Sequence, residues 1–361
     1  MRKRDILSDK VSIIIPTRNR RDLLRQALRS ARAQTWRETE ILIVDEASSD
    51  GTADMVAAEF PSVRMVRHDR PRGPGGARNA GLGATDSNWV LFFDDDDLLH
   101  PGHVEALLRA SSTAPPGSVV SGQWRRFTTI DGEVRLGPIM CAPENRRGIE
   151  ALAEALEPQG EGTICCHSML WPRRIFADVL WDEQLSTNGD VDFFGRAILA
   201  GTPIVGRPVG MAYYRAHSGS RVAGRATLRS LLSAARYRLK WSQLLLSHPE
   251  HQVCAAAMRN GFMTLMIGLS GVPEAQELVP SLRDAFRLWG GQRYYVTSPP
   301  RHPVKRLIAE GMLKLGGPMA LHWLLKQTSR PGRIRDAQLS GYFASETAAD
   351  QMDASTIRAV E

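Results

Sequence analysis

A run of four aspartates at residues 94–97 directly follows an apolar segment at residues 89–93. Neighbouring carboxylates repel one another unless a cation or a water-filled cleft absorbs their charge, so a divalent metal ion is the economical explanation. Asp94 and Asp96 are two residues apart and would point to the same side of an extended chain. One would then contact the metal and the other a ribose or a second ligand. The alternative is a solvated acidic loop or a helix cap before Leu98.

A second carboxylate, Asp45, stands at the end of another apolar segment at residues 40–44. It is suited to accept a hydrogen bond from a nucleobase N–H or a ribose hydroxyl. Residues 48–52 have the composition of a turn and a helix N-cap, and capping is the competing explanation for Asp45.

A loop of arginines and glycines at residues 70–76 precedes a helix. This setting favours anions, although such a loop alone is more typical of an ordinary turn.

Alternating strands and helices position these residues. Apolar, β-branched runs predict strands at residues 11–15, 40–44, 63–67 and 89–93. The intervening patterns predict helices at residues 19–34, with Asn19 as the cap, at 51–60 and at 77–83. Continuous apolar strands joined by helices indicate a parallel sheet covered on both faces. Ligands bind at the carboxyl ends of such strands, which is where Pro16, Thr17, Asp45 and the acidic run lie.

The pattern changes after His100. It predicts helices at residues 101–110 and 190–200, and strands at 118–129, 134–139 and 209–215, with a turn at Asp131 and Gly132. Beyond residue 222 only helical patterns occur, at residues 226–247, 251–268, 274–289 and 303–327. We therefore predict a nucleotide-binding and catalytic domain at residues 1–222, a helical accessory region at 223–330, and a polar, loosely ordered tail at 331–361.

The composition is that of a globular protein, with 43% apolar and 24% charged residues among 361. The formal net charge of +7 comes almost wholly from arginine and predicts anionic partners. Nucleic acid is not expected, because no aromatic platform is interleaved with the arginines. The four cysteines have neither zinc-site nor disulfide spacing, and no signal core or membrane-length apolar stretch occurs. We expect a cytoplasmic protein.

The chain contains, in this order, the segments VSIIIPTRNR, ILIVDEASSDGT, GGARNAGL and FFDDDDLLHP. Together they resemble the nucleotide-binding half of family 2 glycosyltransferases. The similarity continues through WDEQLSTNGDVDFFGRAILAG and closes with YYRAHSGS, so that it covers about residues 11–222. It implies an α/β, GT-A (Rossmann-like) fold with a mostly parallel central sheet flanked by helices, followed here by a C-terminal α-helical region.

The resemblance also implies a nucleotide-sugar site. Pro16, Thr17 and Asp45 would hold the nucleobase, Asn19 would belong to the same site, and Arg78 would lie near the base or the phosphates.

Asp94 and Asp96 would form the DXD pair. Asp96 would coordinate a Mn²⁺ or Mg²⁺ ion that bridges the diphosphate, with Asp94 or Asp95 near the ribose and Asp94 also a candidate metal ligand. His217 resembles a further metal ligand, although a lone histidine there is more often an ordinary surface residue.

Asp190 falls where the family keeps its general base, which removes a proton from the acceptor hydroxyl during an inverting displacement. A helix N-cap is the competing interpretation of Asp190. Two departures from the family pattern occur: Glu46 and Ala47 replace the usual Asp-Gly, and Gly189 stands where a Glu is usual. Asp192 is a fallback base, although on a helix it would point to a different face.

The expected function is transfer of a sugar, most readily from a UDP-sugar, to a hydroxyl of a surface glycan or a lipid-linked acceptor. A nucleotidyltransferase of similar fold and a noncatalytic nucleotide-sugar-binding protein are the alternatives. The amphipathic pattern at residues 303–327 is suited to packing within the protein or to contact with the inner face of the plasma membrane. A homo-oligomer is a further expectation.

Overall fold

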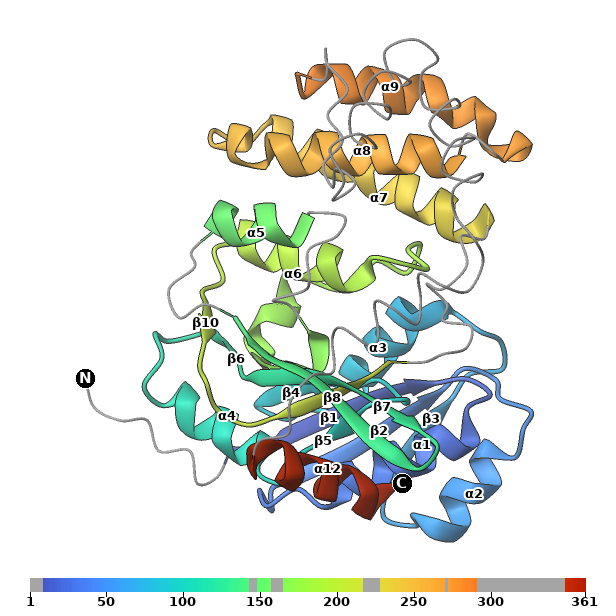
Figure 1. Ribbon diagram of the computed structural model, residues 1–361, viewed down its shortest axis with the longest axis vertical. Coiled ribbons are helices and arrows are strands. Elements are labelled where there is room, and N and C mark those ends of the chain that lie inside the picture. Colours follow the sequence, from blue (N-terminus) through green and yellow to red (C-terminus); the bar gives the residue numbers. More distant parts are fainter. Residues whose placement is uncertain (1–8, 143–147, 157–164, 217–227, 270–271, 291–347) are drawn as a thin grey trace.

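The computed structural model describes residues 9–142, 148–156, 165–216, 228–269, 272–290 and 348–361. Figure 1 shows a central sheet with helices on both faces, and a stack of three helices, α7, α8 and α9, at one end of the molecule. Helices α5 and α6 lie between that stack and the sheet. The predicted α/β architecture with C-terminal helices is confirmed.

The main sheet has seven strands in the order β10-β6-β9-β4-β1-β2-β3. These strands are β1 (Val11–Thr17), β2 (Thr39–Asp45), β3 (Arg64–Arg67), β4 (Trp89–Phe92), β6 (Val119–Ser121), β9 (Met169–Pro172) and β10 (Ile204–Gly206). β1 is parallel to both β2 and β4, β3 is parallel to β2, and β10 is parallel to β6. Only β9 runs antiparallel to its neighbours, β4 and β6. The sheet is therefore mostly parallel, as predicted.

Both faces of this sheet are buried, because successive residues of each strand point to opposite sides. On β1, Ile13 and Ile15 pack with helices α1 (Arg21–Arg32), α2 (Thr52–Glu59) and α4 (His103–Ser111). Ile14 belongs to the core on the other face, with α3 (Gly73–Gly83), α5 (Gly148–Leu156) and α6 (Gly189–Leu199). Two-sided burial explains why the strands are continuously apolar in the sequence.

A second, four-stranded sheet has the order β5-β11-β7-β8. Its strands are β5 (Leu98–Leu99), β7 (Gln123–Ile130), β8 (Glu133–Cys141) and β11 (Ala212–Arg215). The predicted turn at Asp131 and Gly132 joins β7 to β8, with both residues at positive φ. The short strand β5, directly after the acidic run, was not predicted.

The chain's last described helix, α12 (Ala348–Val360), packs on this second sheet. Ile357 shares a core cluster with Phe127 and Tyr213. Asp353 accepts hydrogen bonds from Arg125 and from the hydroxyl of Tyr213, at 2.9 and 2.6 Å. This part of the tail, for which loose order was expected, is helical because its apolar face and Asp353 have buried partners here.

The accessory helices are α7 (Leu228–Leu246), α8 (Ala255–Leu269) and α9 (Val279–Leu288), and short 3₁₀ turns at His251–Cys254 and Pro273–Leu278 precede the last two. Their apolar faces join the core that contains α6, through Trp241, Phe262 and Phe286. The helix predicted at residues 303–327 lies outside the described residues. Among the helices that are described, none combines the length and apolarity needed to cross a bilayer.

Candidate active site

The acidic run lies at the carboxyl end of β4, beside the end of β1. It forms a turn in which the Asp97 N–H points to the Asp94 carbonyl at 3.4 Å. The turn brings Asp94 and Asp97 together, whereas an extended chain would have paired Asp94 with Asp96. The expectation of an extended segment was therefore wrong.

Asp95 and Asp96 are engaged by the loop after β1. Asp95 accepts hydrogen bonds from Thr17 Oγ1 at 2.6 Å and from Arg20 Nη1 at 2.9 Å. The same Arg20 nitrogen lies 2.7 Å from Asp96 Oδ2. Burial raises the pKa of Asp95 to about 6, against the opposing charge of Arg20. Arg20 therefore compensates much of the negative charge in the middle of the run.

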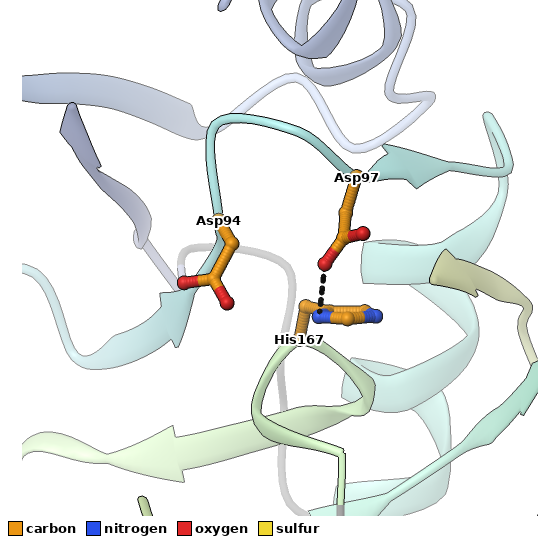
Figure 2. Close-up of side chains that lie close together, drawn as sticks. All are labelled: Asp94, Asp97 and His167. Atoms are coloured by element: carbon orange, nitrogen blue, oxygen red, sulfur yellow. Dashed lines mark ion pairs between the residues drawn. The ribbon is translucent and has the colours of Figure 1, made fainter. Parts of the chain in front are cut away.

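Asp94, Asp97 and His167 bring one ligand atom each to within 4.8 Å of one another. Figure 2 shows the two carboxylates and the imidazole converging, with Asp97 Oδ2 3.1 Å from His167 Nδ1. His167 lies in a 3₁₀ turn, Cys166–Ser168, that leads into β9. Because β9 pairs with β4, this turn is brought next to the acidic run.

The donor set fits a divalent cation, since two carboxylates and one imidazole are ligands that Mn²⁺ accepts. Asp97 Oδ2 is buried and forms no aligned hydrogen bond with any described residue. Burial lowers the pKa of His167 to about 4, so the ring is neutral near pH 7 and has a lone pair for a metal. Burial, with the charges of Asp96 and Asp94, raises the pKa of Asp97 well above its ordinary value. A bound cation would reverse that shift.

Of the three predicted metal ligands, the structure places one in the group formed with Asp97 and His167. Asp94 belongs to the convergent group, while the carboxylate of Asp96 faces Arg20 and His217 lies outside the described residues. Both therefore stay predictions. His167 was missed, because nothing in its local sequence distinguishes it and only the pairing of β9 with β4 places it here.

Arg78 connects the acidic run to the segment before α6. Its guanidinium donates to Asp94 Oδ1 at 2.6 Å and lies 4.4 Å from the Trp181 ring centroid. Burial disfavours the charge of Arg78, but Asp94 and Asp190 outweigh it and raise its pKa. Arg78 is therefore a buried cation held against Asp94 of the metal group.

The glycine-rich loop is largely helical, because α3 begins at Gly73 and not near Ala77 as predicted. The backbone N–H groups of Arg72 and Gly73 both donate to Glu46 Oε2 at 2.6 Å. Glu46 Oε1 lies 2.5 Å from His68 Nδ1. The carboxylate of Glu46 thus occupies the anion position at the start of α3.

The ends of β1 and β2 place three predicted nucleotide-binding residues together. Thr17 and Asp45 are partners in the parallel register. Asp45 is fully buried, accepts the Ser48 N–H at 3.0 Å, and lies 3.3 Å from Arg67 Nε. Pro16 precedes Thr17 on β1. Arg67 is thus the charged neighbour of Asp45.

Asn19 does not cap α1, whose N-cap is Arg20. Its backbone has a φ of 52°, and its side-chain oxygen accepts the Ser49 N–H at 2.8 Å. Asp50 supplies the cap instead, by accepting the Arg21 N–H at 2.9 Å. Asn19 thus joins the loop after β1 to the loop after β2.

The two aspartates at the start of α6 have opposite environments. Asp190 is exposed, whereas Asp192 is fully buried and contacts Arg196, Lys240 and Trp241. Two residues correspond to about 200° of helical rotation, which puts these side chains on different faces. Asp192 is therefore a buried ion-pair partner, as its position on the helix suggested, and Asp190 is the carboxylate open to a substrate.

The mostly parallel sheet with flanking helices is a GT-A type fold. Residues 12–180 match the family described as Glycosyl transferase family 2. The crystal structure of S. aureus TarS 1-349 in complex with UDP-GlcNAc has a TM-score of 0.53 and 17% identity, covering 79% of this chain and 93% of that chain. That likeness shows a shared fold.

Two curated relatives match a shorter stretch. The succinoglycan biosynthesis protein ExoO of Rhizobium meliloti is 38% identical over 123 residues, or 34% of this chain and 35% of ExoO. The GalNAc(5)-diNAcBac-PP-undecaprenol beta-1,3-glucosyltransferase of Campylobacter jejuni is 33% identical over 107 residues, or 28% of this chain and 35% of that protein. The match spans about a third of each relative.

Proposed function

We propose that this chain is an inverting glycosyltransferase that moves a sugar from a nucleotide diphosphate donor to an acceptor hydroxyl. The observation that carries the proposal is the convergence of Asp94, Asp97, His167 and Arg78 at the carboxyl end of the sheet, with Asp190 exposed nearby on α6. The UDP-GlcNAc bound to TarS, which shares this fold, supports a UDP-sugar as the donor. The name of the C. jejuni relative supports a lipid-linked glycan as the acceptor.

The donor would lie across the ends of β1, β2 and β4. Thr17, Pro16, Asn19 and Asp45 are proposed to contact the nucleoside, with Arg67 moving aside to expose Asp45. Arg78 is proposed to attract the diphosphate, because it is a cation held beside Asp94. The proposed role of Asp95 is indirect, since Thr17 and Arg20 already occupy its carboxylate.

A Mn²⁺ or Mg²⁺ ion held by Asp94, Asp97 and His167 would supply Lewis-acid neutralisation of the departing diphosphate. Asp96 and His217 remain proposed as further ligands. For Asp96 to serve, Arg20 would have to release its carboxylate, which now lies 2.7 Å from Arg20 Nη1.

Asp190 is proposed as the general base. Its carboxylate takes the proton of the acceptor hydroxyl while that oxygen attacks the anomeric carbon from the face opposite the diphosphate. The bond from the anomeric carbon to the diphosphate oxygen breaks, and the nucleotide diphosphate leaves with the electron pair. Attack from the opposite face inverts the anomeric configuration.

The test is a panel of UDP-, GDP- and dTDP-sugars, measured for thermal stabilisation and for Mn²⁺-dependent release of nucleotide diphosphate. Asp190→Asn should lower turnover by about 10²- to 10⁴-fold with donor affinity nearly unchanged. Asp94→Asn should lose metal-dependent donor binding. Asp86→Asn is the matched control, because Asp86 is exposed before the amino end of β4.

Failure of every donor to stabilise the protein or to be hydrolysed would overturn the enzymatic proposal. Normal turnover by Asp190→Asn would remove only the assignment of the base. Membrane contact through residues 303–327 is a separate proposal, and unchanged liposome flotation after deletion of these residues would refute it.

A further inference from the structure

Residues 182–188, which we call the base loop, connect Trp181 to the first turn of α6 without regular secondary structure. Its last residue, Asn188, is the N-cap of α6 and has a φ of 60° and a ψ of 17°. Asparagine adopts this left-handed region more readily than other non-glycine residues, and here it directs the chain into α6 two residues before Asp190. The surroundings of the base loop therefore decide how Asp190 is presented.

At its beginning, the base loop is tied to the donor side of the molecule. The side-chain amide of Asn79, on α3, donates to the Trp181 carbonyl at 3.0 Å and accepts the Trp181 N–H at 2.9 Å. Arg72 pairs with Glu183 at 3.0 Å. Asn79 and Arg72, which make these contacts, both belong to the N-terminal half of the chain that is proposed to bind the nucleotide.

At its end, the base loop is held by the accessory helix α7. Ser233 Oγ accepts the N–H groups of both Ser186 and Thr187, at 3.0 and 3.2 Å. Ser233 is only 6% exposed, so no bulk water replaces these bonds. One hydroxyl oxygen has two lone pairs and therefore satisfies both donors.

The same helix also fixes the turn of α6 that follows Asp190. Lys240 Nζ lies 2.8 Å from Asp192 Oδ1 and 2.7 Å from Asp182 Oδ2, which joins α6 and the base loop through one ammonium group. Trp241 Nε1 donates to Asp192 at 3.1 Å. Helix α7 thus holds the chain on both sides of Asp190 while leaving Asp190 exposed.

We propose that Ser233 is a positioning residue for Asp190, so that helix α7 is part of the catalytic apparatus and not only an appended layer. This inference rests on the proposed role of Asp190 as the base. Loss of the Ser233 hydroxyl frees two backbone N–H groups immediately before Asn188, the N-cap of α6. The base loop then shifts, and Asp190 loses its alignment with the acceptor oxygen while the donor pocket stays intact.

The test compares Ser233→Ala with Ser242→Ala. Ser242 lies on the same helix, is similarly buried, and accepts one hydrogen bond, from Trp289 Nε1 at 2.8 Å, on the side facing α9. The reaction is Mn²⁺-dependent hydrolysis of the UDP-sugar that gives the largest thermal stabilisation. Water then replaces the acceptor hydroxyl, its oxygen bonds to the anomeric carbon, its proton goes to Asp190, and UDP leaves.

Ser233→Ala should lower kcat by about tenfold or more, because small displacements of a reacting group reduce rates steeply. The Kd for the UDP-sugar should stay within about twofold. Ser233→Thr, which keeps the hydroxyl, should restore most of the rate. Hydrogen exchange should speed up at the Ser186 and Thr187 amides in Ser233→Ala and not in Ser242→Ala.

Equal kcat values for Ser233→Ala and Ser242→Ala, each corrected for folded protein, would overturn the positioning role. Asp190→Asn is measured in the same series to separate the two claims. If Asp190→Asn is inactive and Ser233→Ala is normal, only the positioning inference fails. If Asp190→Asn is fully active, the assignment of the base fails and the positioning inference fails with it.

Discussion

Replacing Asp192 tests whether the two aspartates of α6 have different roles, with Asp192 stabilising the fold and Asp190 acting as the proposed base. Its carboxylate is fully buried and lies 2.8 Å from both Arg196 Nη2 and Lys240 Nζ. The Trp241 indole N–H also donates to it. Replacing Asp192 by Asn keeps the size of the side chain but removes the negative charge that compensates two cations.

The expected cost follows from burial. Removing one partner of a buried ion pair costs about 3 to 5 kcal/mol, because the opposite charge is left uncompensated. Here Lys240 retains Asp182 at 2.7 Å, and the side chains of Lys240 and Arg196 are 28% and 22% exposed. We therefore expect the low end of that range, about 3 kcal/mol of unfolding free energy.

Asp182→Asn is the control, because Asp182 contacts the same lysine from a more exposed position. It should cost no more than about 1 kcal/mol, as exposed ion pairs do. Urea unfolding followed by tryptophan fluorescence measures both values. Equal losses for the two variants would refute the argument from burial.

Turnover per folded molecule is a second measurement that separates a structural role of Asp192 from a catalytic one. Asp192→Asn should retain turnover within about tenfold, whereas loss of a general base lowers it by about 10²-fold or more. If a folded Asp192→Asn protein is as inactive as Asp190→Asn, then Asp192 takes part in the chemistry.

Two further predictions concern the metal group and the turn after β2. His167→Ala should weaken Mn²⁺ binding by at least about tenfold, as measured by Mn²⁺ titration with electron paramagnetic resonance, whereas Asp86→Asn should bind Mn²⁺ normally. Equal affinities in these two variants would place the metal elsewhere. Ala47→Gly should raise the unfolding free energy by about 1 kcal/mol, because Ala47 has a φ of 58° and glycine adopts this conformation without strain. A lower urea midpoint for Ala47→Gly would contradict this reasoning.

The sequence predicted the strands and helices well wherever local periodicity decides the structure. The strands ending at Thr17, Asp45 and Phe92 carry unbroken apolar runs, because both of their faces are buried. The start of α3 was misplaced, because the buried carboxylate of Glu46, distant in sequence, stabilises its first N–H groups. The helix at the chain's end was missed because it depends on Arg125 and Tyr213 of the second sheet.

The sequence by itself determined the fold class and the strand end at which the acidic residues gather, and it indicated the resemblance to family 2 glycosyltransferases. These follow from motif order and from hydrophobic periodicity, which are local properties of the chain. Tertiary structure decided which carboxylates converge, because a turn pairs Asp94 with Asp97 and an antiparallel strand brings His167 beside them. It also decided that Ser233 contacts the base loop, since contacts between residues distant in sequence depend on how helices pack.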